Sequence, residues 1–293
     1  ARPARPLTVV EGDGNLGVQG DGFEVLFSYI EGGPVSLRIR GNEWLWRAPR
    51  PAVWRASTDN DRGCGFPQRS AVWMAADALT RTGKPEQVEI TEQKVTVRYR
   101  FKLLGVPQAE AVLTYTVTDQ GAMEVEATYH GAPEAPELPC FGVKFQTAAP
   151  VAVTRWTGLS GETYPDRWKG AAFGSFEEVP HHEPHLVPQD GGMHMNTRRA
   201  VLQQRDSRGR TTAALELQSC GTPFAFSALP NTAQELEAAQ HPDELPVTGR
   251  TSVTVLGAVR GVGGIDSWWS DVEEPYRLDG TADYTVKFRI LLR

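Results

Sequence analysis

Apolar and polar residues alternate over several separate stretches of this chain, and this period of two constrains its fold more than any other feature. In residues 95–101 (VTVRYRF) the apolar side chains fall on one face of an extended chain and the polar side chains on the other. The same pattern recurs in residues 113–117, 123–129 and 284–290. Such alternation is typical of antiparallel strands that bury one face and expose the other to solvent.

Few segments predict helix. Thr232 and Glu235 have the spacing of a capping box, which would open a short helix through Ala239, and a second short helix is expected from Ser70 to Leu79. Two short helices among many strands exclude a barrel of alternating strands and helices. We therefore predict an all-β fold, a large antiparallel two-sheet sandwich with one or two short helices.

The domain organisation is expected to be simple. Residues 1–20 are predicted to be a linker or N-terminal extension, because the chain begins with the proline-stiffened sequence ARPARP. Residues 21–293 are predicted to form one domain, since no internal boundary is sharp enough to divide them and sandwiches of about 200–250 residues are common as single domains.

Composition excludes several classes of partner. The chain has 293 residues and a formal net charge of −6, and it lacks a run dense in lysine and arginine, which argues against nucleic acid or an anionic membrane surface as a partner. No apolar stretch approaches the ~18 residues that span a bilayer. Cys64, Cys140 and Cys220 lie far apart without a C-x-x-C motif. Neither a disulfide framework nor a zinc site is therefore expected. A reducing, cytoplasmic location is expected instead.

Residues 261–270 (GVGGIDSWWS) combine a glycine-rich turn with two adjacent indoles and an acid–hydroxyl pair. A flat indole stacks on the apolar C–H face of a sugar while nearby polar groups set its orientation, so this loop is a candidate sugar contact. The alternative is that Trp268 and Trp269 are core aromatics beside a turn. Neighbours on an extended chain point to opposite faces, however, so at most one of the two indoles is expected to fill a given core.

A second candidate is the polar sequence from Asp59 to Gly63 (DNDRG). It could hydrogen-bond sugar hydroxyls or bind a hard cation through its oxygens. It could instead form an Asx-turn in which a local Arg–Asp pair holds a loop. Asp59 and Asp61 are the nearest approach to paired carboxylates, but a retaining glycosidase places its two carboxyl groups about 5–5.5 Å apart across a sugar ring, which one loop rarely achieves alone.

Two further polar segments are ambiguous. Residues 181–185 (HHEPH) have enough ligands for a metal, but Pro184 breaks any helix that would align the histidines and the order is not H-E-x-x-H, so no metal site is predicted. Residues 164–167 (YPDR) form a dense polar–aromatic stretch that suits either architecture or a site. Motifs for serine hydrolases and for nucleotide binding are absent from the sequence.

Taken in order, these segments resemble the C-terminal domain of the large β-galactosidases of glycoside hydrolase family 2, from about Phe23 to Arg293. The resemblance rests on four groups of motifs, which are Trp54-Arg55-Ala56 with residues 59–63, residues 156–162 with 164–167, residues 190–192 with 196–198, and residues 261–268. The family's domain is a two-sheet supersandwich similar to that of galactose mutarotases. The resemblance therefore implies a two-sheet antiparallel sandwich, which is also the fold that the strand pattern predicts.

The resemblance also implies a division of labour. In the family the catalytic glutamates lie on a TIM barrel earlier in the polypeptide, so no catalytic residue is expected in this chain and the isolated chain should be inactive. The implied partners are a β-galactoside substrate, a catalytic TIM-barrel portion that carries the Mg²⁺ and Na⁺ ions, and further copies of the chain. Trp268 would stack against the substrate. A mobile active-site loop would include Asp59, Asn60, Asp61, Gly63, Cys64, Gly65 and Phe66, although the sequence departs from the family pattern after Gly63.

Two other functions remain open on the sequence alone. A stand-alone aldose epimerase would need a general acid and base around the anomeric carbon, for which His130, His194 and Glu162 are the only loose candidates. A non-catalytic carbohydrate-binding module would need only an exposed aromatic platform such as Trp268.

Overall fold

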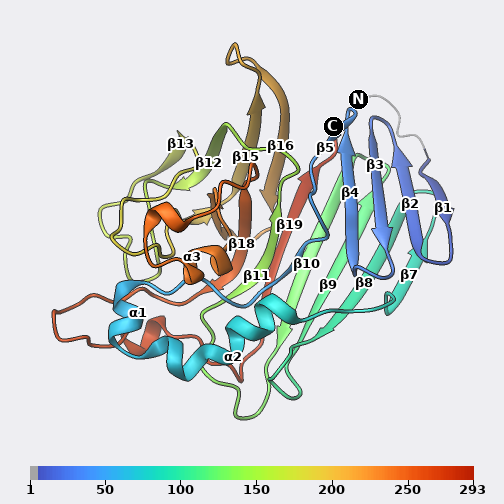
Figure 1. Ribbon diagram of the computed structural model, residues 1–293. Helices are drawn as coiled ribbons and strands as arrows, with labels where there is room; N and C mark the ends of the chain where they lie inside the picture. The colour runs from blue at the N-terminus through green and yellow to red at the C-terminus, as the bar shows by residue number, and fades with distance from the viewer. Residues whose placement is uncertain (1–5) are drawn as a thin grey trace.

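The structure is a computed structural model that describes residues 6–293, and its strands form antiparallel sheets in two layers (Figure 1). One layer is a nine-stranded sheet with the order β13-β12-β15-β16-β19-β10-β9-β8-β7. Its strands are β7 (Gln87–Ile90), β8 (Lys94–Lys102), β9 (Glu110–Thr118), β10 (Ala122–His130), β12 (Val153–Leu159), β13 (Phe173–Glu178), β15 (Arg199–Arg205), β16 (Thr211–Ser219) and β19 (Tyr284–Leu291).

The second layer consists of two five-stranded sheets. The first is a meander of β1 (Thr8–Glu11), β2 (Asn15–Gly20), β3 (Phe23–Ser28), β4 (Gly33–Ile39) and β5 (Asn42–Glu43). The second has the order β14-β17-β18-β11-β6 and contains β6 (Arg50–Ala52), β11 (Cys140–Gln146), β14 (His194–Thr197), β17 (Phe224–Leu229) and β18 (Ser252–Val259). An isolated antiparallel bridge between Leu45 and Thr147 joins the two sheets side by side.

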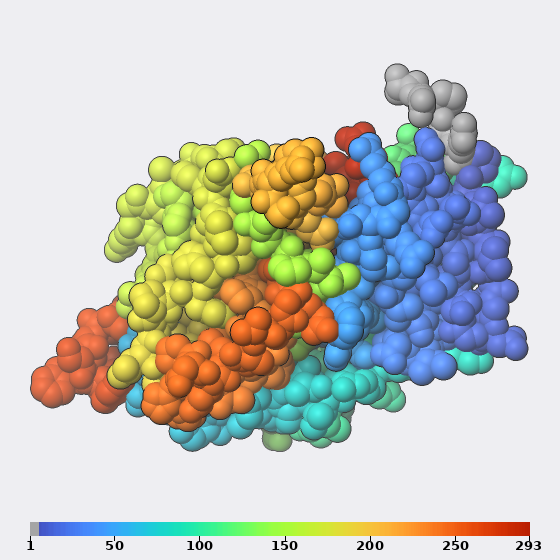
Figure 2. Space-filling model, turned by 45° about the horizontal axis from the view of Figure 1, so that its top comes forward, coloured from blue at the N-terminus to red at the C-terminus, as the bar shows by residue number. Residues whose placement is uncertain are grey.

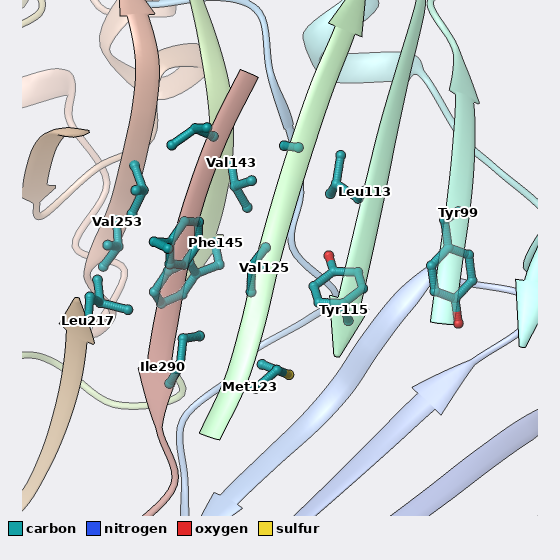
Figure 3. Close-up of a cluster of buried hydrophobic side chains, with 14 of the residues drawn as sticks. Tyr99, Leu113, Tyr115, Met123, Val125, Val143, Phe145, Leu217, Val253 and Ile290 are labelled. Carbon is teal, nitrogen blue, oxygen red and sulfur yellow. The ribbon is translucent and has the colours of Figure 1, made fainter. Parts of the chain in front are cut away.

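The alternating stretches form strands as predicted, and their apolar faces lie in the core between the layers (Figure 3). Aromatic pairs connect the layers, since the rings of Phe27 and Tyr115 lie 5.8 Å apart and those of Phe224 and Phe288 lie 6.2 Å apart. The all-β sandwich is thus confirmed. The structure differs from the prediction in one respect, since one layer is divided into two sheets. The division occurs between β5 and β6, which do not pair with each other.

The predicted N-terminal extension over residues 1–20 is wrong from Thr8 onward. Strands β1 and β2 pair with each other and with β3, and the side chains of Leu16 and Val18 are buried. Strand β2 is held in the sheet because its apolar residues at alternate positions pack into the core between the layers. Residues 1–5, where the proline-stiffened sequence begins, lie outside the described residues.

The helices lie together at one end of the sandwich (Figure 1). They are α1 (Asp59–Gly63), α2 (Phe66–Leu79) and α3 (Ala233–Ala238), with 3₁₀ turns at Pro242–Glu244 and Glu274–Tyr276. The capping box predicted for α3 is confirmed, whereas α2 starts four residues before the predicted Ser70 and α1 was not predicted. No helix within residues 6–293 is long and apolar enough to cross a membrane.

Two buried tyrosines give a matched test of the core. The Tyr115 hydroxyl has no hydrogen-bond partner within the described chain, whereas the Tyr129 hydroxyl donates to the Gly280 carbonyl at 2.6 Å. Tyr115→Phe should therefore leave the free energy of unfolding unchanged or raise it, and Tyr129→Phe should lower it by about 1 kcal/mol. Urea denaturation of both variants measures the difference, and a larger loss for Tyr115→Phe would contradict this description of the core.

Candidate functional site

The tryptophan loop, residues 261–271, leaves β18 and projects from the helical end of the sandwich. Trp268 in this loop is 85% exposed, so its indole is available to a ligand or partner. The Asp266 carboxylate shapes the turn by accepting hydrogen bonds from the Trp268 amide at 2.9 Å and from the Ser270 hydroxyl at 2.5 Å. The Ser270 hydroxyl and the Trp268 amide also lower the pKa of Asp266.

Trp269 takes a different conformation from the one expected for an extended chain. Its φ is +65°, in the left-handed region that bulky residues rarely adopt, and its side chain is also largely exposed. Its indole lies over Gly63, where a Cβ atom would overlap the ring. At most one of the two indoles was expected to fill the core, and in the structure neither does, because the backbone turns at Trp269 instead of continuing as a strand.

Residues from two distant motifs hold the base of the tryptophan loop. The Asp166 carboxylate accepts hydrogen bonds from the amides of Val262 at 3.0 Å and Gly263 at 2.7 Å. The guanidinium of Arg167 donates to the Gly263 carbonyl at 2.7 Å, and the Asn60 side-chain amide donates to the Val262 carbonyl at 3.0 Å. The motifs at residues 59–63 and 164–167 thus share one structural role, which is to fix the start of this loop.

The glycines of the loop permit this close packing. Gly264 has φ +79°, and a Cβ atom there would collide with the side chains of Arg167 and Asn60. A Cβ atom on Gly261 would collide with the Asp166 carboxylate. Larger residues at these two positions would push the loop away from its anchors.

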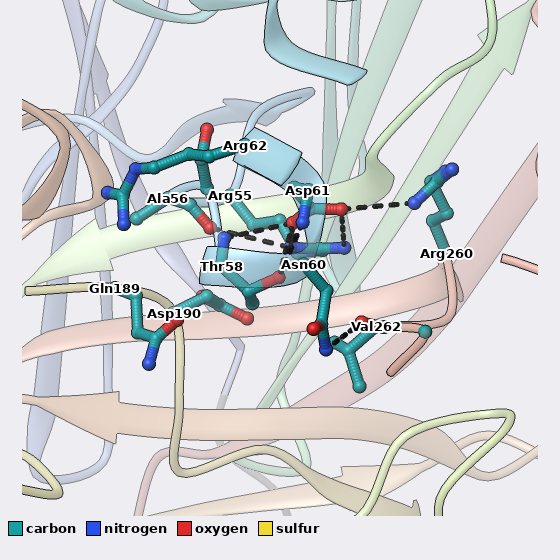
Figure 4. A network of polar contacts seen from close by, with 12 residues as sticks. Arg55, Ala56, Thr58, Asn60, Asp61, Arg62, Gln189, Asp190, Arg260 and Val262 are labelled. Atoms are coloured by element: carbon teal, nitrogen blue, oxygen red, sulfur yellow. Dashed lines mark hydrogen bonds and ion pairs between the residues drawn. The ribbon is translucent and has the colours of Figure 1, made fainter. Parts of the chain in front are cut away.

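Below the loop, Asp61 lies between two arginines (Figure 4). Its carboxylate contacts Arg55 Nη1 at 2.6 Å and Arg260 Nη1 at 3.0 Å, and all three side chains are buried. Burial alone would raise the pKa of Asp61, but the charge and hydrogen bond of Arg55, together with the Thr58 amide, lower it overall. Arg55 also donates to the Gly261 carbonyl at 3.0 Å, so the charged cluster supports the loop directly.

The two aspartates of the DNDRG sequence have separate roles. They lie on α1, which Thr58 and Asp61 begin with a reciprocal capping box, and not on an extended chain. Asp61 points into the core, whereas Asp59 is exposed and pairs with Arg62 at 3.3 Å. Asp59 and Asp61 therefore do not form a pair of carboxylates on one face. The alternative of an arginine–aspartate pair that holds a loop describes Asp61 better, although its partners are Arg55 and Arg260.

The mobile loop expected over residues 63–66 is a helix junction in the structure. Gly63 ends α1, Cys64 caps it, and Gly65 in the left-handed conformation starts α2 at Phe66. Phe66 is buried beneath the guanidinium of Arg260, whose central carbon lies 3.9 Å from the ring centroid. The segment of the expected loop is thus a short link between two helices that leads into a buried ring.

Arg260 is the important residue that sequence reasoning missed. Its fully buried guanidinium contacts Asp271 at 2.5 Å and also pairs with Glu137 and Asp61. A signal was available, since Arg260 is the sole charged residue in the apolar run 252–265. A lone charge that follows a buried strand indicates a buried ion pair.

Asp190 from the motif at residues 190–192 lies on the other side of Arg55. Its carboxylate accepts a hydrogen bond from the Tyr164 hydroxyl at 2.6 Å. Burial raises the pKa of Asp190 to about 6, even though the Arg55 charge and the Tyr164 hydrogen bond act in the opposite direction. One segment of the second motif group, through Tyr164, and one segment of the third, through Asp190, therefore lie against the charged cluster.

The candidate acid and base of an epimerase do not form a site. His194 is buried against Trp156, with ring centroids 3.7 Å apart, and both ring nitrogens contact protein groups, Gly161 O and Glu178 Oε1. Glu162 accepts the amide of Gly192 at 2.7 Å. His130 is exposed and pairs instead with Asp283.

The histidines of residues 181–185 also make ordinary contacts. His181 Nδ1 lies 2.9 Å from the Val179 carbonyl, and His182 Nε2 lies 3.0 Å from Asn231 Oδ1. In residues 6–293, no group of three or more His, Cys, Asp or Glu side chains is arranged to hold a metal ion.

The Asp61 cluster can be tested with two identical substitutions in one motif. Asp61→Asn should lower the free energy of unfolding by about 3–5 kcal/mol, because two buried guanidinium groups lose their shared counter-charge. Asp59→Asn removes an exposed pair and should change it by less than about 0.5 kcal/mol. Thermal and urea unfolding of both variants measure the contrast, and equal losses would refute the role assigned to Asp61.

Comparison with known proteins adds to this geometry. The family model described as "Beta galactosidase small chain" matches residues 19–290. The chain is 44% identical to a β-galactosidase small subunit from Latilactobacillus sakei, over 99% of both chains. It is 34% identical to a β-galactosidase from Streptococcus thermophilus and 37% identical to one from Lactobacillus delbrueckii subsp. bulgaricus, but it spans only 28% and 27% of their lengths.

Among solved structures, a galactose mutarotase-like protein from Lactobacillus casei matches 97% of this chain with a TM-score of 0.49 and 11% identity. The sequence matches are the more informative comparison, since they extend over nearly the whole chain and include all four motif groups. On these matches, the chain belongs to the β-galactosidase small chain family.

Proposed function

We propose that this chain is the small subunit of a β-galactosidase and forms one wall of a galactoside pocket whose catalytic glutamates and metal ions lie on a TIM-barrel partner. The observation that carries the proposal is the exposed indole of Trp268 on a loop whose base is fixed by Asp166, Asn60 and Arg55. A fixed loop presents an indole at a constant position, which favours stacking on the apolar face of a sugar.

The relatives support the two-chain arrangement. One of similar length is named a small subunit, whereas the single-chain β-galactosidases are more than three times as long as the part that this chain matches. The two aspartates nearest to paired carboxylates are both paired with arginines, Asp61 with Arg55 and Arg260 and Asp59 with Arg62. The catalytic groups are therefore assigned to the partner.

The surface beside the tryptophan loop has the character of a docking face for that partner. Both ends of segment 168–189 lie near the base of the tryptophan loop. The segment follows Arg167, which donates to the Gly263 carbonyl at 2.7 Å, and Arg62 of α1 donates to the Pro188 carbonyl at 3.1 Å. Large apolar side chains that are exposed on the two segments define this docking face, namely Trp168, Phe173, Val179, Leu186, Ile265 and Trp269. Exposed apolar surface that a partner covers is typical of protein interfaces.

The alternatives fit the structure less well. An aldose epimerase is disfavoured because His194 is stacked and hydrogen-bonded in the core and His130 lies with Asp283. A purely carbohydrate-binding module would use Trp268 in the same way but would need no docking face.

Recombination with the TIM-barrel subunit tests the proposal, and Trp268 variants identify the sugar contact. The chain alone should hydrolyse no β-galactoside, and mixing should restore turnover. In the mixture, Trp268→Ala should raise KM by about 5- to 150-fold, equivalent to ~1–3 kcal/mol, with a smaller change in kcat. Trp268→Phe should be intermediate. Turnover by the isolated chain, or a wild-type KM for Trp268→Ala, would refute the proposal.

A second experiment tests the docking face independently of catalysis. Leu186→Asp should weaken association with the TIM-barrel subunit at least ~10-fold, because it places a charge in an apolar interface. Val10→Asp, at another exposed apolar position on the edge strand β1, should leave association unchanged. Analytical ultracentrifugation of each mixture measures the affinity, and equal affinities for the two variants would exclude this face.

A further inference from the structure

A large hollow lies at the end of α2 away from the tryptophan loop. It has a volume of about 800 Å³, within the range of ligand pockets. Helix α2 has 14 residues, so its two ends are about 20 Å apart at 1.5 Å per residue. Figure 2 shows the yellow and orange segments of the C-terminal half lying next to the blue N-terminal strands on this face of the molecule. The hollow is thus separate from the proposed galactoside site.

The lining of the hollow is rich in positive charge. Lys144 pairs with Asp77, Arg50 pairs with Glu31 at 3.4 Å, and the Glu235 carboxylate caps α3 through the Thr232 amide. The other cationic side chains of the lining have no carboxylate within ion-pair distance in residues 6–293, and these are Arg47, Arg81 and Arg250. Three unpaired guanidinium groups around one hollow are unexpected in a chain with a net charge of −6.

Arg50 shows that the positive charge is not fully compensated. Its Nη1 atom is buried and has no hydrogen-bond partner within the described residues. Burial lowers the pKa of Arg50, and the positive charges of Arg81 and Arg47 lower it further. A negative charge in the hollow would offset the mutual repulsion of these guanidinium groups.

Trp46 and Arg250 add a preorganised element. The central carbon of the Arg250 guanidinium lies 3.5 Å from the centroid of the Trp46 ring, and no carboxylate pairs with this arginine. Stacking restricts the guanidinium while its N–H groups stay free to bind an anion. Trp46 is about half exposed, so part of the indole remains accessible to the body of a ligand.

We propose that this hollow binds a small phosphate monoester with a hydroxylated body, such as a sugar phosphate. A phosphate monoester carries a charge of about −1.5 to −2 at pH 7 and three strong acceptor oxygens, which suits several unpaired guanidinium groups better than one carboxylate does. Gln146, Gln234 and Ser252 in the lining supply polar groups for the hydroxyls. The inference does not depend on the proposed β-galactosidase role.

The test is calorimetric titration of the full chain with glucose 6-phosphate, inorganic phosphate, gluconate and glucose. Glucose 6-phosphate should bind most tightly, phosphate and gluconate should bind at least ~10-fold more weakly, and glucose should not bind measurably. Arg250→Ala should weaken glucose 6-phosphate binding by ~10-fold or more, and Arg250→Lys should recover only part of the loss because lysine lacks the planar fork.

Arg208→Ala, at an exposed arginine of the β15–β16 turn, is the matched control and should bind as the wild type does. Unfolding curves establish that each variant is folded, and Arg81→Ala provides a second test if Arg250→Ala is unstable. The proposal is overturned if glucose 6-phosphate fails to bind at 10 mM. It is also overturned if gluconate binds equally well, or if the TIM-barrel subunit abolishes binding by occupying the hollow itself.

Discussion

The contact of Asp61 with Arg55 and Arg260 is the interaction on which the rest of the site depends. It joins the segment before α1, α1 itself and the end of β18, with Arg260 and Asp61 lying 199 residues apart in the sequence. Buried ion pairs contribute little net stability, because desolvation offsets most of the attraction. Each charge nevertheless needs its partner, so the cluster permits one arrangement of these segments and thereby fixes where the tryptophan loop begins.

This arrangement separates the rigid part of the site from the part that meets a ligand. The charged cluster and the Asp166 carboxylate hold residues 261–263 by their backbone. Beyond them, Asp266 organises the turn that exposes Trp268, and Trp269 adopts a left-handed conformation against Gly63. Strained backbone at an exposed aromatic residue is typical of binding sites. The proposed galactoside contact is therefore a short loop on a rigid base.

The sequence predicts the parts of this molecule that depend on local order. Alternation over residues 95–101 specifies a buried strand face, and the Thr232–Glu235 capping box specifies α3, because both signals lie within a few neighbouring residues. The role of Asp61 was not predictable in this way, since Arg260 is distant in the chain. The strands within residues 8–20 were also not predicted, because a short hairpin is stable only when it pairs with a further strand, here β3.

The two ends of α2 use arginine in opposite ways. At its start, Arg55 and Arg260 are buried and both contact Asp61, so their charges are balanced within the protein. At its end, the Nη1 atom of Arg50 is equally shielded from water but has no acceptor. An unsatisfied N–H does not by itself distinguish the two ends, since Arg55 Nε is also buried without an acceptor in the described residues. The difference lies in the charge balance, because Arg47, Arg81 and Arg250 around the hollow have no carboxylate within ion-pair distance in residues 6–293. This unbalanced charge is the physical basis for assigning an anionic ligand to the hollow.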